Sequence, residues 1–145
     1  MRCVHAPHWF VVFVLVLAGM GSNAWAQAAQ PQRVDVPQAA TLEGVPTVRV
    51  DTTPSGASRR LLDAMEREQS RLTVQKVNGA YVWTSRDNKM LTLFNEGPFT
   101  YLSAAPGQYI RFTQVNDRIT YVEHIDSPIG SVTWFGELRV VLGKR

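Results

Sequence analysis

The sequence predicts a mainly β domain: a small antiparallel meander of about six to seven strands, with one N-terminal helix packed on it. From Leu72 onward, apolar β-forming residues alternate with polar ones, which is the period of half-buried strands. Turn signals recur about every eight to twelve residues in the same region, the spacing of antiparallel strands joined by short turns. A barrel-like closure and a strongly curved open sheet both fit this pattern.

Six turn signals divide the second half of the chain. Asn78-Gly79 is the strongest, because this dipeptide is favoured in two-residue hairpins. The others lie at 86–88, 95–98, 105–107, 116–117 and 127–130, and each contains Gly, Pro, Asn or Asp. The expected strands are therefore 72–77, 80–85, 89–95, 98–103, 108–115, 118–125 and 131–142.

The first 26 residues have the order of a secretory signal peptide. A weakly basic start precedes an apolar run from Trp9 to Leu17, and a small-x-small motif ends at Ala26. The run is shorter than the roughly 20 residues that a membrane-spanning helix needs. We expect cleavage after Ala26, a periplasmic or secreted product, and no membrane span in the mature chain.

Cleavage at that point also changes the chemistry that the chain can perform. It removes Cys3, His5 and His8, so the mature chain has no thiol and one imidazole, His124. Structural zinc sites need several such ligands, so we expect no metal and no cofactor. The net charge of +3 falls to +2 with the loss of Arg2, and the remaining charges are scattered. Since nucleic-acid binding requires a basic stripe, no nucleic-acid partner is expected.

The segment 27–57 is rich in Pro, Ala and Gln and is expected to be a flexible tether. Its 41–51 part has an alternative interpretation as an edge strand, because Val48 and Val50 alternate with polar residues. The domain itself is expected at 58–145. It would begin with a helix over 58–71, capped by Ser55 or Ser58 and buried through Leu61, Leu62 and Met65.

The two clearest hairpins predict which side chains share a face. A two-residue loop at Asn78-Gly79 places Val74 opposite Trp83, on the face expected to form the core. A loop at 116–117 places Tyr109 opposite His124 and Arg111 opposite Val122, on the other face of that hairpin. Tyr109, Arg111 and His124 are thus predicted to form a polar, aromatic cluster toward solvent, with an ordinary solvent-facing sheet as the alternative.

Glu123 falls on the apolar face of the same hairpin, opposite Ile110. A carboxylate in that place is expected to lie at the sheet rim, where it reaches water or an arginine. If it were instead buried, its pKa would be perturbed and it would become a functional candidate.

These observations favour a non-catalytic exported domain that binds an envelope protein or a glycan through Tyr109, Arg111 and His124. One alternative is an inhibitor of a secreted, lysozyme-like enzyme, or a carbohydrate-binding module. Another is a hydrolase that uses Glu123 or His124, the latter with Asp126 and Ser127. The ligand and the oligomeric state stay open at this level.

Overall fold

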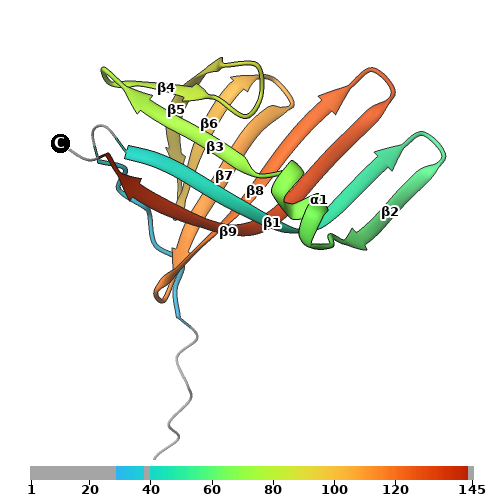
Figure 1. Ribbon diagram of the computed structural model, residues 1–145, viewed down its shortest axis with the longest axis horizontal. Helices are drawn as coiled ribbons and strands as arrows, with labels where there is room; N and C mark the ends of the chain where they lie inside the picture. Colours follow the sequence, from blue (N-terminus) through green and yellow to red (C-terminus); the bar gives the residue numbers. More distant parts are fainter. Residues whose placement is uncertain (1–28, 38–39, 144–145) are drawn as a thin grey trace, which may run out of the picture.

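The computed structural model describes residues 29–37 and 40–143 as an antiparallel eight-stranded barrel with one extra strand and a very short helix (Figure 1). The expected signal peptide, 1–26, lies outside the described residues. The mainly β class is confirmed. The sheet closes on itself because β1 pairs with β9 on one side and with β3 on the other. No helix among the described residues is long and apolar enough to cross a membrane.

All seven strands expected after residue 71 are present, with ends within two residues of the expected positions. Two further elements, β2 and α1, lie between the first strand of the barrel and the second. The strands are β1 (Ala40–Thr53), β2 (Gly56–Leu61), β3 (Leu72–Val77), β4 (Ala80–Trp83), β5 (Lys89–Glu96), β6 (Phe99–Ala105), β7 (Gln108–Val115), β8 (Arg118–Ser127) and β9 (Gly130–Leu142), and the helix is α1 (Ala64–Gln69).

The expected tether is wrong from residue 40 onward, because this segment forms β1, the longest strand. Its first half alternates buried and half-buried residues, and Leu42 lies in the core. The alternative interpretation of 41–51 as a strand is confirmed, but its place at an edge is wrong, since β1 is paired on both sides. Pro46 is tolerated because the register with β9 shifts between Pro46 and Val48, where a missing backbone donor costs least.

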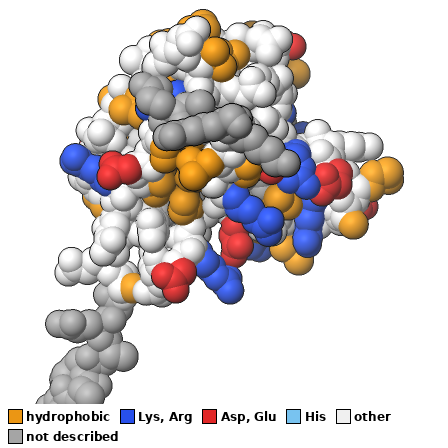
Figure 2. Space-filling view, turned by 60° about the vertical axis from the view of Figure 1, so that its left-hand side comes forward, with side chains coloured by type: hydrophobic (Ala, Val, Ile, Leu, Met, Phe, Trp, Pro, Cys, Tyr) orange, Lys and Arg blue, Asp and Glu red, His pale blue; other side chains and the backbone are white. Residues whose placement is uncertain are grey.

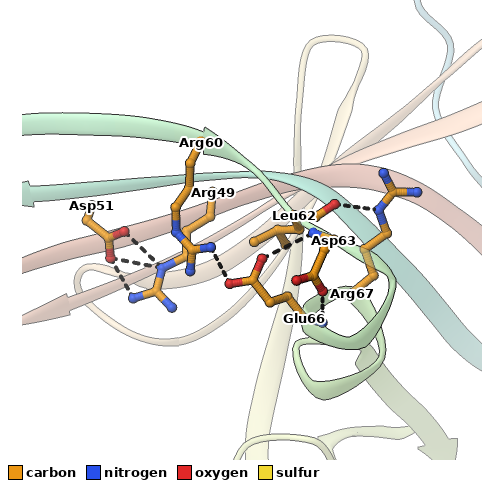
Figure 3. Close-up of polar contacts among 7 residues, drawn as sticks. All are labelled: Arg49, Asp51, Arg60, Leu62, Asp63, Glu66 and Arg67. Carbon is orange, nitrogen blue, oxygen red and sulfur yellow. Dashed lines mark hydrogen bonds and ion pairs between the residues drawn. The ribbon is translucent and has the colours of Figure 1, made fainter.

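The expected helix over 58–71 is wrong in most of its length. Residues Gly56–Leu61 form β2, which pairs with β1, and α1 begins only at Ala64. Asp63 is the N-cap: its carboxylate accepts from the Glu66 backbone N–H, while the Glu66 side chain accepts from the Asp63 backbone N–H (Figure 3). Glu66 also pairs with Arg60 of β2. Of the expected apolar stripe, Leu62 is buried, whereas Leu61 and Met65 are exposed.

The described N-terminal arm, 29–37, closes one end of the barrel. Gln32 and Gln114 exchange two backbone hydrogen bonds of 2.7 and 2.8 Å, and Arg33 Nε donates to the Gly97 carbonyl at 2.8 Å. Val34 is only 8% exposed and belongs to the core cluster. The arm therefore covers one end of the barrel. None of its hydrogen bonds involves Tyr109, Arg111 or His124.

The interior of the barrel is filled by large side chains from all eight strands, and Trp83, Tyr121 and Phe112 are the largest that are fully buried. The predicted register of the first hairpin is confirmed, with Val74 opposite Trp83. Leu72, Val74, Tyr81 and Trp83 are all buried, as their shared face predicts. The barrel is therefore a packed core with side chains in place of a lumen.

Candidate functional site

The second predicted hairpin register is confirmed in full and brings two of the three candidate residues together. Tyr109 lies opposite His124 and Arg111 lies opposite Val122. The Tyr109 and His124 rings are stacked, with centroids 5.1 Å apart. The turn between β7 and β8 holds this register, since Asn116 adopts φ = 55°, the left-handed region that asparagine tolerates.

His124 is held by hydrogen bonds at both ring nitrogens. Nδ1 lies 2.8 Å from Thr133 Oγ1 on β9, and Nε2 lies 2.9 Å from Asp126 Oδ1 on its own strand. These contacts fix the orientation of the ring against Tyr109. The sequence analysis named Asp126, two residues along the strand, as a possible partner of His124. The contact with Thr133 was not predicted, because it depends on the register between β8 and β9.

Arg111 is presented differently, on the face of another aromatic ring. Its guanidinium carbon lies 4.8 Å from the centroid of the Phe99 ring. No ion pair joins Arg111 to a carboxylate of the described residues. The contact with Phe99 holds the side chain in place, and the planar N–H fork of a guanidinium is suited to carboxylates and phosphates.

Further aromatic residues continue the predicted cluster across the barrel wall. Tyr101 lies opposite Arg111, and Phe94 lies opposite Tyr101 with the two rings stacked at 4.8 Å. Tyr101 also contacts Tyr109 at 6.0 Å between centroids. We call Phe94, Tyr101, Tyr109, Arg111 and His124 the outer strip. No alternation in the sequence marks Phe94 and Tyr101 as outward, because apolar residues stand on both faces of β5 and β6, and their place beside Tyr109 depends on the barrel register.

A groove with a volume of about 360 Å³ adjoins the outer strip at Arg111. Its floor is formed by β7 and β8, and Phe99 on β6 and Phe135 on β9 stand on either side. The β1 bulge between Pro46 and Val48 brings Thr47 to its border. The lining residues are Thr47, Phe99, Arg111, Phe112, Thr113, Thr120, Tyr121, Val122, Phe135, Gly136 and Glu137.

Glu123 is placed inside the barrel and is 0% exposed, so its expected position at a solvent-accessible rim is wrong. The expected arginine partner is present: Arg86 Nη2, from the β4–β5 turn, lies 2.9 Å from Glu123 Oε1. Neither carboxylate oxygen receives a hydrogen bond of good geometry, so the contact is chiefly electrostatic. Burial raises the pKa of Glu123 to about 7, although the charge of Arg86 opposes the shift.

Trp134 lies beside this buried pair and is contacted by two arginines. The guanidinium carbon of Arg86 is 5.2 Å from the Trp134 ring, and that of Arg49 is 5.6 Å from it. Arg49 is itself held by a bidentate contact with Asp51, with distances of 2.6 to 3.0 Å (Figure 3). The Arg86–Glu123 pair therefore packs under an aromatic side chain at the end of the barrel opposite the arm.

The described residues contain no group of three or more His, Cys, Asp and Glu side chains arranged to hold a metal ion. The catalytic arrangement of His124, Asp126 and Ser127 is not formed, because the Ser127 hydroxyl donates to the Gly130 carbonyl at 2.9 Å. What the geometry offers is a rigid outward surface of aromatic, imidazole and guanidinium groups beside a groove. Comparison with protein-family models, curated proteins and solved structures finds no match for this chain.

Proposed function

We propose that this chain is an exported, non-catalytic β-barrel domain that binds a partner in the bacterial envelope through its outer strip. The observation that carries the proposal is the joint outward presentation of Tyr109, Arg111 and His124, each oriented by a specific contact. Tyrosine and arginine are the residue types most enriched among the energetically dominant residues of interfaces. Side chains held in one orientation before binding also lose less entropy when a partner docks.

Export and a periplasmic or secreted location are part of the same proposal. The basic, apolar and small-residue order of 1–26 supports cleavage after Ala26. A mature chain without cysteine suits this barrel, which packs its core without disulfide bonds. On the face shown in Figure 2, basic side chains lie beside acidic ones, which supports a partner other than nucleic acid.

The arrangement of the rings favours a protein partner over a glycan. Sugars bind aromatic residues by lying flat on an exposed ring face. In the outer strip, Phe94 and Tyr101 cover each other's faces at an interplanar angle of 6°, and Tyr109 is stacked on His124. One face of each of these rings is therefore covered by its neighbour, so the outer strip offers less open ring face than isolated aromatic residues would, which suits the mixed polar and apolar surface of a protein.

The test is affinity capture of envelope proteins by the purified exported chain and by a Tyr109→Ala, Arg111→Ala, His124→Ala triple variant. A matched control carries Arg139→Ala, Val77→Ala and Met90→Ala, which likewise truncates three side chains, one of them an arginine, at exposed positions away from the strip. We expect the strip variant to lose the captured proteins and the control variant to retain them. If both variants keep the melting temperature of the parent and capture the same proteins, the outer strip is not the binding surface.

A second candidate is an inhibitor of a secreted glycan-acting enzyme, favoured by Arg111, which lines the groove and has no ion pair among the described residues. Enzymes that hydrolyse glycosidic bonds use two carboxyl groups flanking the scissile bond, and an arginine can pair with such groups. Inhibition of lysozyme by the parent chain, lost in Arg111→Ala, would support this candidate. Equal lysozyme activity with and without the chain would dismiss it for that enzyme.

The hydrolase alternative receives the least support. Glu123 is sealed inside the barrel, where a substrate cannot reach its carboxylate. The hydroxyl beside His124 is that of Thr133, whereas Ser127, the nucleophile of the expected arrangement, donates to the Gly130 carbonyl.

A further inference from the structure

We infer that the groove beside Arg111 holds a partner segment in which a carboxylate side chain is next to an apolar one. The carboxylate would pair with Arg111, and the apolar side chain would lie against Phe135. This inference rests on the proposed binding function and adds the chemistry of the partner to it.

The charge of the groove carries the first step. Arg111 is the only cation among the lining residues, and it has no described carboxylate partner. The one acidic lining residue, Glu137, is paired with Arg118 at 3.1 Å. With Arg118 counted beside the lining residues, two positive charges stand against one negative charge, and an anionic group complements the excess.

The stacking of Arg111 on Phe99 carries the second step. The guanidinium carbon lies over the Phe99 ring, 4.8 Å from its centroid, and this contact restricts the rotation of the side chain. A carboxylate can then accept two parallel hydrogen bonds from the fork, and little side-chain entropy is lost on binding.

The remaining lining carries the third step. Phe135, which is 38% exposed, and Val122 give the groove an apolar wall beside the arginine. A volume of about 360 Å³ equals on the order of a dozen waters, which suits one or two side chains. The strands of the floor, β7 and β8, are each paired on both sides, so no backbone groups are free to add a partner strand. Recognition through side chains is the mode that remains.

The experiment uses an array of synthetic octapeptides in which Asp or Glu is next to Leu, Val or Phe, each printed beside its Asn or Gln counterpart. The tightest acid–amide pair is then measured in solution by fluorescence anisotropy. We expect the parent chain to bind the acidic peptide roughly tenfold or more tightly than the amide peptide, as a charge-assisted bidentate contact implies. Arg111→Gln should abolish that preference, and Arg111→Lys should keep only part of it.

The control is Arg139→Gln, which removes an exposed arginine of β9 that has no ion pair among the described residues, and it should keep the full preference. Equal binding of acidic and amide peptides by the parent chain would overturn the inference, and so would an unchanged preference in Arg111→Gln. Binding of an anionic oligosaccharide with no binding of any peptide would overturn it as well. If the strip variant loses its envelope partners while the array shows no acid preference, only the groove inference fails. An acid preference without loss of envelope capture would leave the groove inference standing and the proposed function refuted.

Discussion

Glu123 shows at the scale of one residue how far a strand pattern can be trusted. The hairpin register predicted an inward side chain, and the structure confirms it, since Glu123 lies opposite Ile110 and is completely buried. The hairpin register could not predict the ion-pair partner of Glu123. This partner is Arg86, which lies in the turn between β4 and β5 and reaches the carboxylate from the end of the barrel. A contact between residues so far apart in sequence depends on closure of the barrel.

The buried carboxyl predicts a pH-dependent stability. Burial raises the pKa of Glu123 from 4.5 to about 7 in the folded chain, so folding favours the protonated form. The stabilising effect is therefore complete below pH about 4.5 and disappears as the pH rises to about 7. A difference of about 2.5 pKa units corresponds to on the order of 3 kcal/mol. Urea unfolding across this range should show the decline in the parent chain and a much flatter profile in Glu123→Gln. Matching profiles would mean that Glu123 titrates normally.

The ion pair itself predicts an asymmetric response to mutation. Arg86→Met leaves a buried carboxylate without its counter-charge, which costs about 3–5 kcal/mol in comparable buried pairs. The double variant Arg86→Met, Glu123→Gln carries no buried charge and should recover much of that loss. The cost of Arg86→Met should also shrink at pH 5, where Glu123 is protonated. Denaturant unfolding of the three chains at pH 5 and pH 8 checks this, and an equal loss in the single and double variants would contradict it.

At the scale of elements, the sequence pattern predicted the strands that pair with their neighbours in the chain. The strands from β3 to β9 and two hairpin registers follow from alternation and turn residues. The long strand β1 was expected only as an alternative, because Pro46 and the Pro-rich residues before it resemble a tether and its partners, β3 and β9, lie far along the chain. The helix was overextended because Leu61 and Leu62 fit a helical stripe, whereas pairing of β2 with β1 outweighs that weak preference.

In the candidate site, too, the contacts within one hairpin were predictable and the contacts between other strands were not. Tyr109, Arg111 and His124 share a face within one hairpin, so the sequence sufficed to place them on one face and to pair Tyr109 with His124. Phe99, Thr133 and Phe135 come from β6 and β9, and their contacts needed registers that no turn signal specified. The groove depends in addition on the β1 bulge, whose position was not readable from Pro46 alone.

Gly136 of β9 gives a test of that bulge. A Cβ atom at this position would lie 2.2 Å from the Val45 carbonyl oxygen and 2.8 Å from the Pro46 Cα atom. Both are backbone atoms that cannot rotate away, so Gly136→Ala should destabilise the fold by about 1–3 kcal/mol or more. Thermal unfolding of this variant beside Glu137→Ala, an exposed neighbour, measures the effect. A melting temperature equal to that of the control would show that β1 and β9 can separate locally at little cost.

The N-terminal arm predicts that residues outside the expected domain stabilise it. Val34 is buried in the core cluster, and Val34→Ala removes two carbons from that packing. We expect a loss of about 1–3 kcal/mol, which combines the transfer of those groups with a small cavity. Asp35→Ala, at an exposed position of the same arm, is the control and should leave the unfolding free energy unchanged. Equal stability of the two variants would show that the arm does not contribute to the core.

At the scale of the whole molecule, closure leaves one strand of the described sheet with an open side. Every barrel strand is paired twice, whereas β2 pairs only with β1 and all six of its residues are exposed. Open strand edges promote pairing between copies, and charged side chains on the edge oppose it. Arg59, on β2, has no ion pair among the described residues and is the clearest such charge.

Arg59→Val should therefore increase self-association, because it replaces the edge charge with a residue that favours strands. The matched control is Met90→Val, an exposed apolar-to-apolar change on β5, where both edges are already paired. Static light scattering over a range of protein concentrations should show a rising mass for Arg59→Val and an unchanged mass for the control. High salt should move the parent chain in the same direction, since screening weakens repulsion between the arginines of two approaching copies. If Arg59→Val keeps the mass of the parent at every concentration, the twist of the β1–β2 hairpin, and not its charge, keeps the edge from pairing.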